Sequence, residues 1–181
     1  MWRDRFKHDT GNQALVTIDG TDMRCELRFD KRFYSHKFKR NAVRYEVGVC
    51  IASGDIVWIS GPFRCDVNDL TVSREGGLLG GGLKRGEMAE ADRGYVGEKW
   101  YLKTPTGFHT RTQGEEGMKL QAAARHETVN GRLKIFKVLE TSFRNDLVFH
   151  SSCFRAVAVI TQLNFSLGQM PPYQVKYQDD R

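Results

Sequence analysis

AVRYEVGVCIA, residues 42–52, and DIVWISGPF, residues 55–63, decide the fold class, because both stretches are rich in the β-branched and aromatic residues that favour strands. Ser53-Gly54 lies between them and is typical of a tight hairpin turn. Upstream, residues 14–27 predict a further strand that is bent or ended near Gly20. The sequence therefore predicts three neighbouring antiparallel strands.

Downstream of the hairpin, the sequence predicts shorter elements. Residues 66–79 indicate a partly helical segment with Asp66 as its N-cap. They run into a glycine-rich stretch, residues 76–86, which lacks the GK[ST] ending of a phosphate-binding loop. We expect a flexible loop there and no nucleotide site. Residues 88–95 predict a fourth strand, and residues 99–103 a fifth.

Two helices are predicted in the last third of the chain. Residues 115–141 indicate a long helix, in which Glu127 lies outside the main apolar stripe at 100° per residue. Residues 145–167 indicate a second helix that is apolar on most sides, so we expect it to be buried. The order of strands and helices matches an α/β domain with a ribonuclease-H-like mixed sheet flanked by helices, although other α+β folds share this order.

Length and composition set outer limits on the class of protein. The 181 residues suit one domain over residues 14–168, with a polar N-terminal tail at 1–13 and a C-terminal tail at 169–181. No apolar run reaches the roughly 18 residues of a membrane helix, and no secretory signal is recognisable. The four cysteines form no CxxC pair, so a zinc site is not expected. The net charge of +6 is compatible with a polyanionic partner.

Three acidic residues stand in unusual settings. Asp19 lies inside an apolar strand, Asp92 precedes the turn Arg93-Gly94, and Glu127 lies on a face of small residues. A carboxylate within a strand is costly to desolvate unless it is paired or coordinates a metal. Converging carboxylates repel one another, and bound cations relieve that repulsion. Hard oxygen ligands select Mg²⁺ or Mn²⁺.

Four ordered motifs over roughly residues 14–168 carry a family resemblance. They are TIDGTD (Thr17–Asp22), GPFRCDVNDLTVSR (Gly61–Arg74), EADRGY (Glu90–Tyr95) and ARHETVNGRLKIFKVL (Ala124–Leu139). In their order and spacing the chain resembles the DDE transposase superfamily, and most closely its Harbinger-type eukaryotic branch. The resemblance implies that residues 14–168 form a ribonuclease-H-like catalytic domain that cuts DNA.

The resemblance also implies the roles of individual residues. In the family, the first aspartate, the aspartate before the Gly-Tyr pair and the helix glutamate bind two catalytic ions, Mg²⁺ or Mn²⁺; here these are Asp19, Asp92 and Glu127. Asp19 would bridge both ions in two-metal phosphoryl transfer. Asp69 matches a further family aspartate; it serves either the active site or a helix cap or turn.

The chain departs from the pattern of some relatives around the glutamate. Those relatives carry a tyrosine, an arginine and a lysine where this chain has Leu120, Ala123 and Lys134. Lys134 therefore keeps a predicted DNA contact, and Arg125 is expected to supply a charge from a neighbouring position. The family's usual N-terminal DNA-binding domain is not present in this sequence, so we expect a separate DNA-binding protein to replace it, unless the chain is a fragment.

The segment at residues 31–40 places five Lys or Arg residues among three aromatic residues. Cations for phosphates and rings for stacking suit nucleic acid, so Lys37, Lys39 and Arg40 are predicted DNA contacts. The same segment is compatible with a nuclear-import signal or with a solvated loop. A nuclear protein, which could be a homo-oligomer, is the corresponding expectation.

Three functions remain open from the sequence. The first is an active metal-dependent DNA nuclease or strand transferase, and the second is a transposase-derived, non-catalytic module that binds DNA or protein. The third is a ribonuclease of the same fold, which the transposase motifs favour least. His126 stands beside Glu127, but it points about 100° away around the helix, so we expect it to serve packing or the surface.

Overall fold

A computed structural model of the protein describes residue 3 and residues 14–27, 30–105 and 113–169. Its two long strands are antiparallel partners, β1 (Ala14–Arg24) and β3 (Arg40–Cys50), and β4 (Ile56–Phe63) pairs with the other side of β3. The remaining strands are short: β2 (Tyr34–Ser35), β5 (Met88–Glu90) and β6 (Leu102–Lys103). The predicted antiparallel trio and its hairpin are therefore confirmed, with Gly54 of the turn at a φ of 80°.

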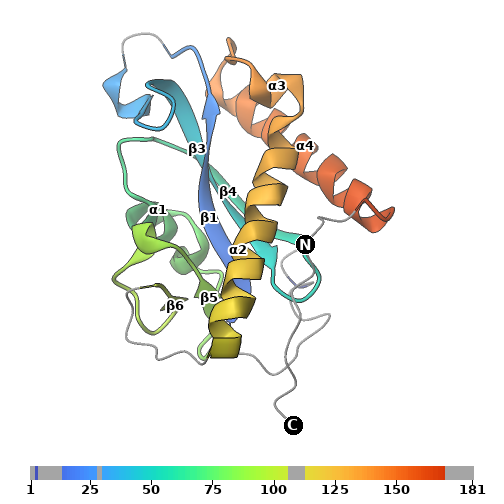
Figure 1. Ribbon diagram of the computed structural model, residues 1–181. Helices are drawn as coiled ribbons and strands as arrows, with labels where there is room; N and C mark the ends of the chain where they lie inside the picture. Colours follow the sequence, from blue (N-terminus) through green and yellow to red (C-terminus); the bar gives the residue numbers. More distant parts are fainter. Residues whose placement is uncertain (1–2, 4–13, 28–29, 106–112, 170–181) are drawn as a thin grey trace.

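The sheet has mixed strand directions. β5 runs parallel to β1, and β6 runs parallel to β5. The order across the sheet is β4-β3-β1-β5-β6, and the two-residue β2 adds to the start of β3. This arrangement, with helices on both sides, is the predicted ribonuclease-H-like α/β fold (Figure 1).

The C-terminal helices cover one face of the sheet. They are α2 (Gln113–Lys134), the single-turn α3 (Lys137–Glu140) and α4 (Leu147–Ser166), and in Figure 1 they pack beside β1, β3 and β4. The other face carries α1 (Asp69–Glu75) and the 3-10 turns η3 (Leu78–Gly80) and η4 (Arg93–Tyr95); a third 3-10 turn, η2 (Lys31–Phe33), precedes β2.

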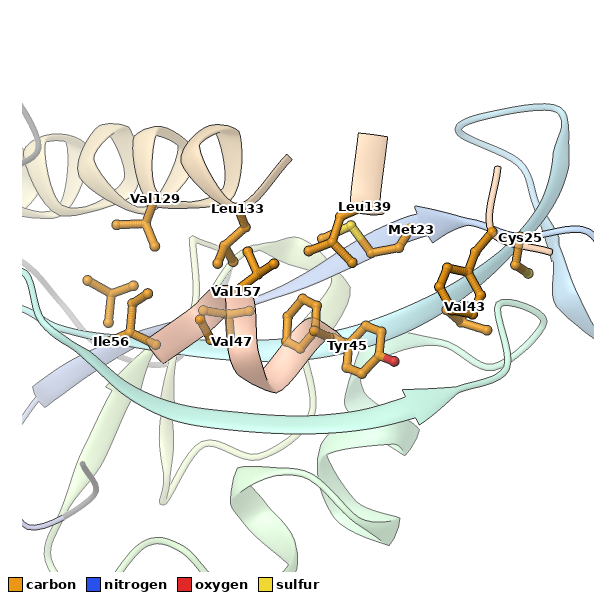
Figure 2. Packing of buried hydrophobic residues seen from close by; sticks show 14 of the residues in the cluster. Met23, Cys25, Val43, Tyr45, Val47, Ile56, Val129, Leu133, Leu139 and Val157 are labelled. Carbon is orange, nitrogen blue, oxygen red and sulfur yellow. The ribbon is translucent and has the colours of Figure 1, made fainter. Parts of the chain in front are cut away.

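Alternation along the strands divides the core into two layers. Figure 2 shows the helix-side layer, in which Val129 and Leu133 of α2 and Val157 of α4 lie over Tyr45 and Val47 of β3. The opposite side chains form a second layer with α1, η3 and η4; its buried members are Val16, Ile18, Cys50, Val57, Leu78, Ala89, Ala91, Tyr95 and Leu102. The sheet is therefore buried on both faces, and polar side chains within it need partners.

Several predicted boundaries were wrong. β1 passes through Gly20 without interruption, and Asn68, not Asp66, caps α1 by accepting from the Thr71 amide at 2.8 Å. The predicted helix to residue 141 breaks after Lys134, because Phe136 is extended and packs against the core.

The glycine-rich stretch is anchored to the sheet through hydrogen bonds, contrary to the expected flexible loop. Leu78 within it is buried, and its amide donates to Glu46 Oε2 at 2.6 Å. A side chain at Gly77 would lie against the same carboxylate. The glycine at 77 therefore allows the loop to approach the sheet.

The expectation of a buried last helix was half wrong. The inner face of α4 is buried, including Phe154, Val157 and Phe165, but Val148 and Leu167 on the outer face are 79% and 80% exposed. Among the described residues, no helix combines the length and apolar character that a membrane crossing requires. The predicted tails at residues 1–13 and 169–181 lie outside the described part, apart from residues 3 and 169.

Candidate active site

The three predicted acidic residues come from three separate elements. Asp19 lies on β1, Asp92 directly precedes η4, and Glu127 lies on α2. β1 and β5 are parallel, with Thr17 opposite Glu90. Asp19 and Asp92 each stand two residues beyond this pair, so Asp92, just past the carboxyl end of β5, is level with Asp19 in the middle of β1.

The charges of these residues act on one another. Burial raises the pKa of Asp19 most, and the negative charges of Asp92, Glu127 and Asp69 add to the shift in that order, which together bring the pKa to about 7. The Gly20 amide is the opposing influence, because its hydrogen bond favours the charged form. The structure therefore brings the predicted trio together and adds Asp69 as a fourth carboxylate.

A cavity of about 250 Å³ opens beside these acids. Asp19, Asp92 and Glu127 all line it, so the carboxylates face a common space. Its other walls are mostly apolar or come from α2: Thr17, Ile18, Glu90, Ala91, Pro105, Lys119, Ala123 and His126.

Asp92 is held by its own turn. Its side chain accepts from the Gly94 amide at 2.8 Å and caps η4. This is a turn-forming role for Asp92. It is compatible with a site role, because a carboxylate has further lone pairs and the Asp92 side chain is exposed at the cavity.

Asp69 reaches the site through an ion pair with β3. Arg44 Nη1 donates to Asp69 Oδ1 at 2.9 Å, and Arg44 Nε donates to the buried Asp22 at 2.8 Å. Burial raises the pKa of Asp69, Arg44 opposes this shift, and Asp92 and Asp22 add to it. Ser35 Oγ donates to the other oxygen of Asp22 at 2.6 Å. The carboxylate of Asp69 therefore lies at the edge of the site, with a fixed cation beside it.

Two buried side chains of α2 hold the helix against β1. Asn130 Nδ2 donates to Asp19 Oδ2 at 3.0 Å, and His126 Nδ1 lies 2.7 Å from Thr17 Oγ1. Burial lowers the pKa of His126 to about 4, so the imidazole is neutral at pH 7. His126 is therefore a buried packing residue in this structure. Glu127 remains exposed between the two contacts.

The predicted DNA contacts fall into different environments. Burial lowers the pKa of Lys134 and nearby Lys37 lowers it further, whereas Glu127, Asp22 and Asp19 act in the opposite direction. Lys37 and Lys134, from distant parts of the chain, thus lie near each other beside the acids. Lys39 and Arg40 are exposed on the same turn. Arg125 is only 4% exposed and donates to the Ile51 carbonyl at 3.0 Å, which argues against its predicted DNA contact.

The acidic side chains of the site offer the type of ligand atom that a hard divalent cation prefers. Their ligand atoms are carboxylate oxygens, and the raised pKa of Asp19 reflects burial first and then the neighbouring negative charges that a cation would neutralise. Among the described residues, however, no three His, Cys, Asp or Glu side chains form a group that could already hold an ion. The Asp92 and Glu127 side chains are exposed and line the cavity.

Some residues of the site were not singled out from the sequence. Asn130 lies three residues after Glu127 on the same side of the helix, so helical spacing alone could have indicated it. Glu90 lies two residues before Asp92 along the strand direction, a spacing that places both on one side. Arg44 had no such signal, because its role depends on the register of β1 and β3, which sets Asp22 opposite it.

Comparison with known proteins agrees with this arrangement. A family model described as DDE superfamily endonuclease matches residues 18–163, which include all of the acids described above. No curated protein matches the chain. With the fold, the converging acids and a family match over most of its length, the chain belongs to the DDE superfamily of endonucleases.

Proposed function

We propose that this chain is the catalytic domain of a Harbinger-type DDE transposase, a metal-dependent DNA endonuclease or strand transferase. The observation that carries the proposal is the environment of Asp19, where burial and three further carboxylates together raise the pKa to about 7. Such an accumulation of like charge is unfavourable for folding alone and is typical of a cation site. The family match supports nuclease chemistry in general.

Asp19, Asp92 and Glu127 would hold the divalent ions, Mg²⁺ or Mn²⁺. The bound ions would supply Lewis acidity and neutralise charge at the scissile phosphate. Asp19 is the central ligand because the charges of both other acids act on it. Lys134 and Lys37 lie on one side of the acids and would bind flanking phosphates of the DNA.

The cleavage experiment uses the purified chain with linear and supercoiled DNA in Mg²⁺ or Mn²⁺. Asp92→Asn removes a charge from the site and should abolish cleavage. Asp66→Asn is the matched control, since Asp66 is an exposed aspartate that contacts Arg64 at 3.3 Å and does not line the cavity. Cleavage that survives Asp92→Asn would remove the assignment. RNA and hybrid substrates in the same assay test the ribonuclease alternative.

A second candidate function is a non-catalytic module that binds DNA or protein. Its supporting observation is Leu120, which is 65% exposed on α2 where some relatives have a tyrosine. Calorimetry with MnCl₂ separates the two candidates. Divalent binding that is lost in Asp19→Asn, Asp92→Asn and Glu127→Gln favours the enzyme, and a protein that binds DNA but no divalent ion favours the module.

The setting of the activity is also part of the proposal. A nuclear protein that acts with a separate DNA-binding protein fits the basic segment at residues 31–40, where Lys37, Lys39 and Arg40 are exposed. A homo-oligomer would bring two such domains to the two ends of a DNA element. Fluorescence localisation with and without charge-removing substitutions in residues 31–40, and light scattering of the purified chain, test these two statements.

A further inference from the structure

Asn130 makes a direct hydrogen bond to the central carboxylate of the site. Its Nδ2 donates to Asp19 Oδ2 at 3.0 Å, from a side chain that is 3% exposed. The ionised carboxylate, which is the form that binds a cation, only accepts hydrogen bonds, and the amide presents its NH₂ group to it. This fixes the orientation of both side chains at the contact between α2 and β1.

The other end of the same amide is unsatisfied. Asn130 Oδ1 is buried and has no hydrogen-bond partner within the part of the chain that the structure describes. A buried acceptor without a partner costs free energy, because its bond to water is lost and not replaced. The neighbouring inward residues Val129 and Leu133 are apolar and pack in the core. An apolar residue at 130 would serve helix packing without leaving an acceptor unpaired.

We infer that Asn130 is a positioning residue: it holds one oxygen of Asp19 so that the carboxylate keeps a fixed orientation at the cavity for a divalent cation. This inference rests on the proposed function. Carboxylates that bind metals are commonly hydrogen-bonded by a second layer of residues, whose loss weakens the metal without removing a ligand. Asn130 cannot carry negative charge, so it orients Asp19 without adding to the repulsion among the four acids.

The alternative role is a structural tie between helix and sheet. The chain offers a matched contact with which to separate the two roles. Gln162 Nε2 of α4 donates to Asp55 Oδ1 at 2.6 Å, beside the start of β4, and its Oε1 accepts from the Ile56 amide at 2.7 Å. This is also an amide-to-aspartate bond between a helix and the sheet, but Gln162 and Asp55 do not line the cavity.

The test compares Asn130→Leu with Gln162→Leu in two measurements. Urea unfolding of the metal-free protein reports stability, and calorimetry with MnCl₂ reports affinity. We expect Asn130→Leu to lose about 10- to 100-fold in Mn²⁺ affinity while its urea midpoint falls no more than that of Gln162→Leu. The control should bind Mn²⁺ as the unsubstituted protein does. Wild-type affinity in Asn130→Leu, or an equal loss of affinity in Gln162→Leu, would overturn the inference.

Two further measurements cover the cases in which Asn130→Leu does not fold or the protein binds no Mn²⁺: a second variant, and a double-mutant cycle without metal. Asn130→Ala replaces Asn130→Leu if the larger side chain prevents folding, because alanine is the residue most favourable to a helix. If the unsubstituted protein binds no Mn²⁺ through its acids, the proposed function fails by itself. The urea midpoints of Asn130→Leu, Asp19→Asn and the double variant then test the contact alone. Non-additive changes support the orientation of Asp19 by Asn130, and additive changes contradict it.

Discussion

Asp69 occupies the space that a side chain at residue 20 would need: a Cβ on Gly20 would lie 2.5 Å from Asp69 Oδ1. Gly20 directly follows Asp19, and Gly94, two residues after Asp92, faces the other oxygen of Asp69 at 2.8 Å from its Cβ position. The two glycines therefore allow Asp69 to lie between the segments that carry Asp19 and Asp92. This close approach explains how a carboxylate from α1 joins the acids on the sheet.

Gly20→Ala should disturb the site through Asp69. The new methyl group would displace a carboxylate that Arg44 holds at 2.9 Å, and overpacking of this kind costs about 1–3 kcal/mol of unfolding free energy. Urea unfolding measures the loss. Gly131→Ala on α2 is the control, because nothing lies within 4 Å of its Cβ position and alanine favours helix by roughly 0.5–1 kcal/mol. A Gly20→Ala protein as stable as the parent would contradict the packing described.

Mn²⁺ affinity should rise with pH up to neutrality. A cation binds the charged form of Asp19, whose pKa without metal is raised to about 7 by burial and by its acidic neighbours. Below that pH, Mn²⁺ must displace a proton, so the affinity should fall by about tenfold for each pH unit. Calorimetry from pH 5.5 to pH 8 measures this. A flat profile would mean that Asp19 does not take part in binding.

His150 should make the protein sensitive to acid independently of the site. It stacks on Tyr45, its Nδ1 lies 2.8 Å from the Tyr45 hydroxyl, and burial lowers its pKa to about 4. An unfolded histidine has a pKa near 6.5, so the unfolded chain binds the proton more tightly, and stability is lost as pH falls below about 6.5.

His150→Phe isolates this effect. From pH 8 to pH 5, the His150 proton should cost the parent protein about 2 kcal/mol that the variant does not lose. The difference between the two proteins is needed, because Asp19, with its raised pKa, contributes in the opposite direction as pH changes. Urea unfolding at pH 8 and at pH 5 measures the loss of unfolding free energy in each protein. Equal losses in parent and variant would exclude His150 as the source.

Lys37 and Lys134 should contribute to DNA affinity through phosphate contacts. Replacing either with Gln should lower the slope of log affinity against log salt by about one, since each contact releases one counterion's equivalent of charge. Fluorescence anisotropy at several salt concentrations measures the slope. Arg85→Gln, an exposed residue before β5, is the control and should leave the slope unchanged. Unchanged slopes in both lysine variants would place the DNA elsewhere.

The antiparallel strands could be predicted because strands and tight turns are specified by residues that are adjacent in the sequence. Strand residues at 42–52 and 55–63, with Ser53-Gly54 between them, specify a hairpin without reference to the rest of the chain. The break after Lys134 was not predictable in this way, because Phe136 leaves the helix in favour of a tertiary contact with the core. Whether helical propensity or core packing determines the backbone at such a residue depends on tertiary contacts, which the sequence alone does not show.

The candidate site was also predictable from the sequence only in part. Asp19, Asp92 and Glu127 came from a family resemblance, and their convergence became visible only when β1 and β5 were placed in parallel register. Helical spacing puts Asn130 on the side of Glu127, but its bond to Asp19 depends on how α2 packs on β1. Arg125 illustrates the limit: nothing in the sequence distinguishes a buried arginine bonded to a carbonyl from one that faces DNA.

The most direct test of the account is the position of Mn²⁺ in crystals grown or soaked with MnCl₂, located by its anomalous scattering. The account predicts density bound to Asp19 and shared with Asp92 and Glu127, as two ions about 3.5–4 Å apart. Crystals of the Asp19→Asn variant should lack it. Manganese bound only at other carboxylates, with the cavity beside Asp19 free of it, would contradict the central claim.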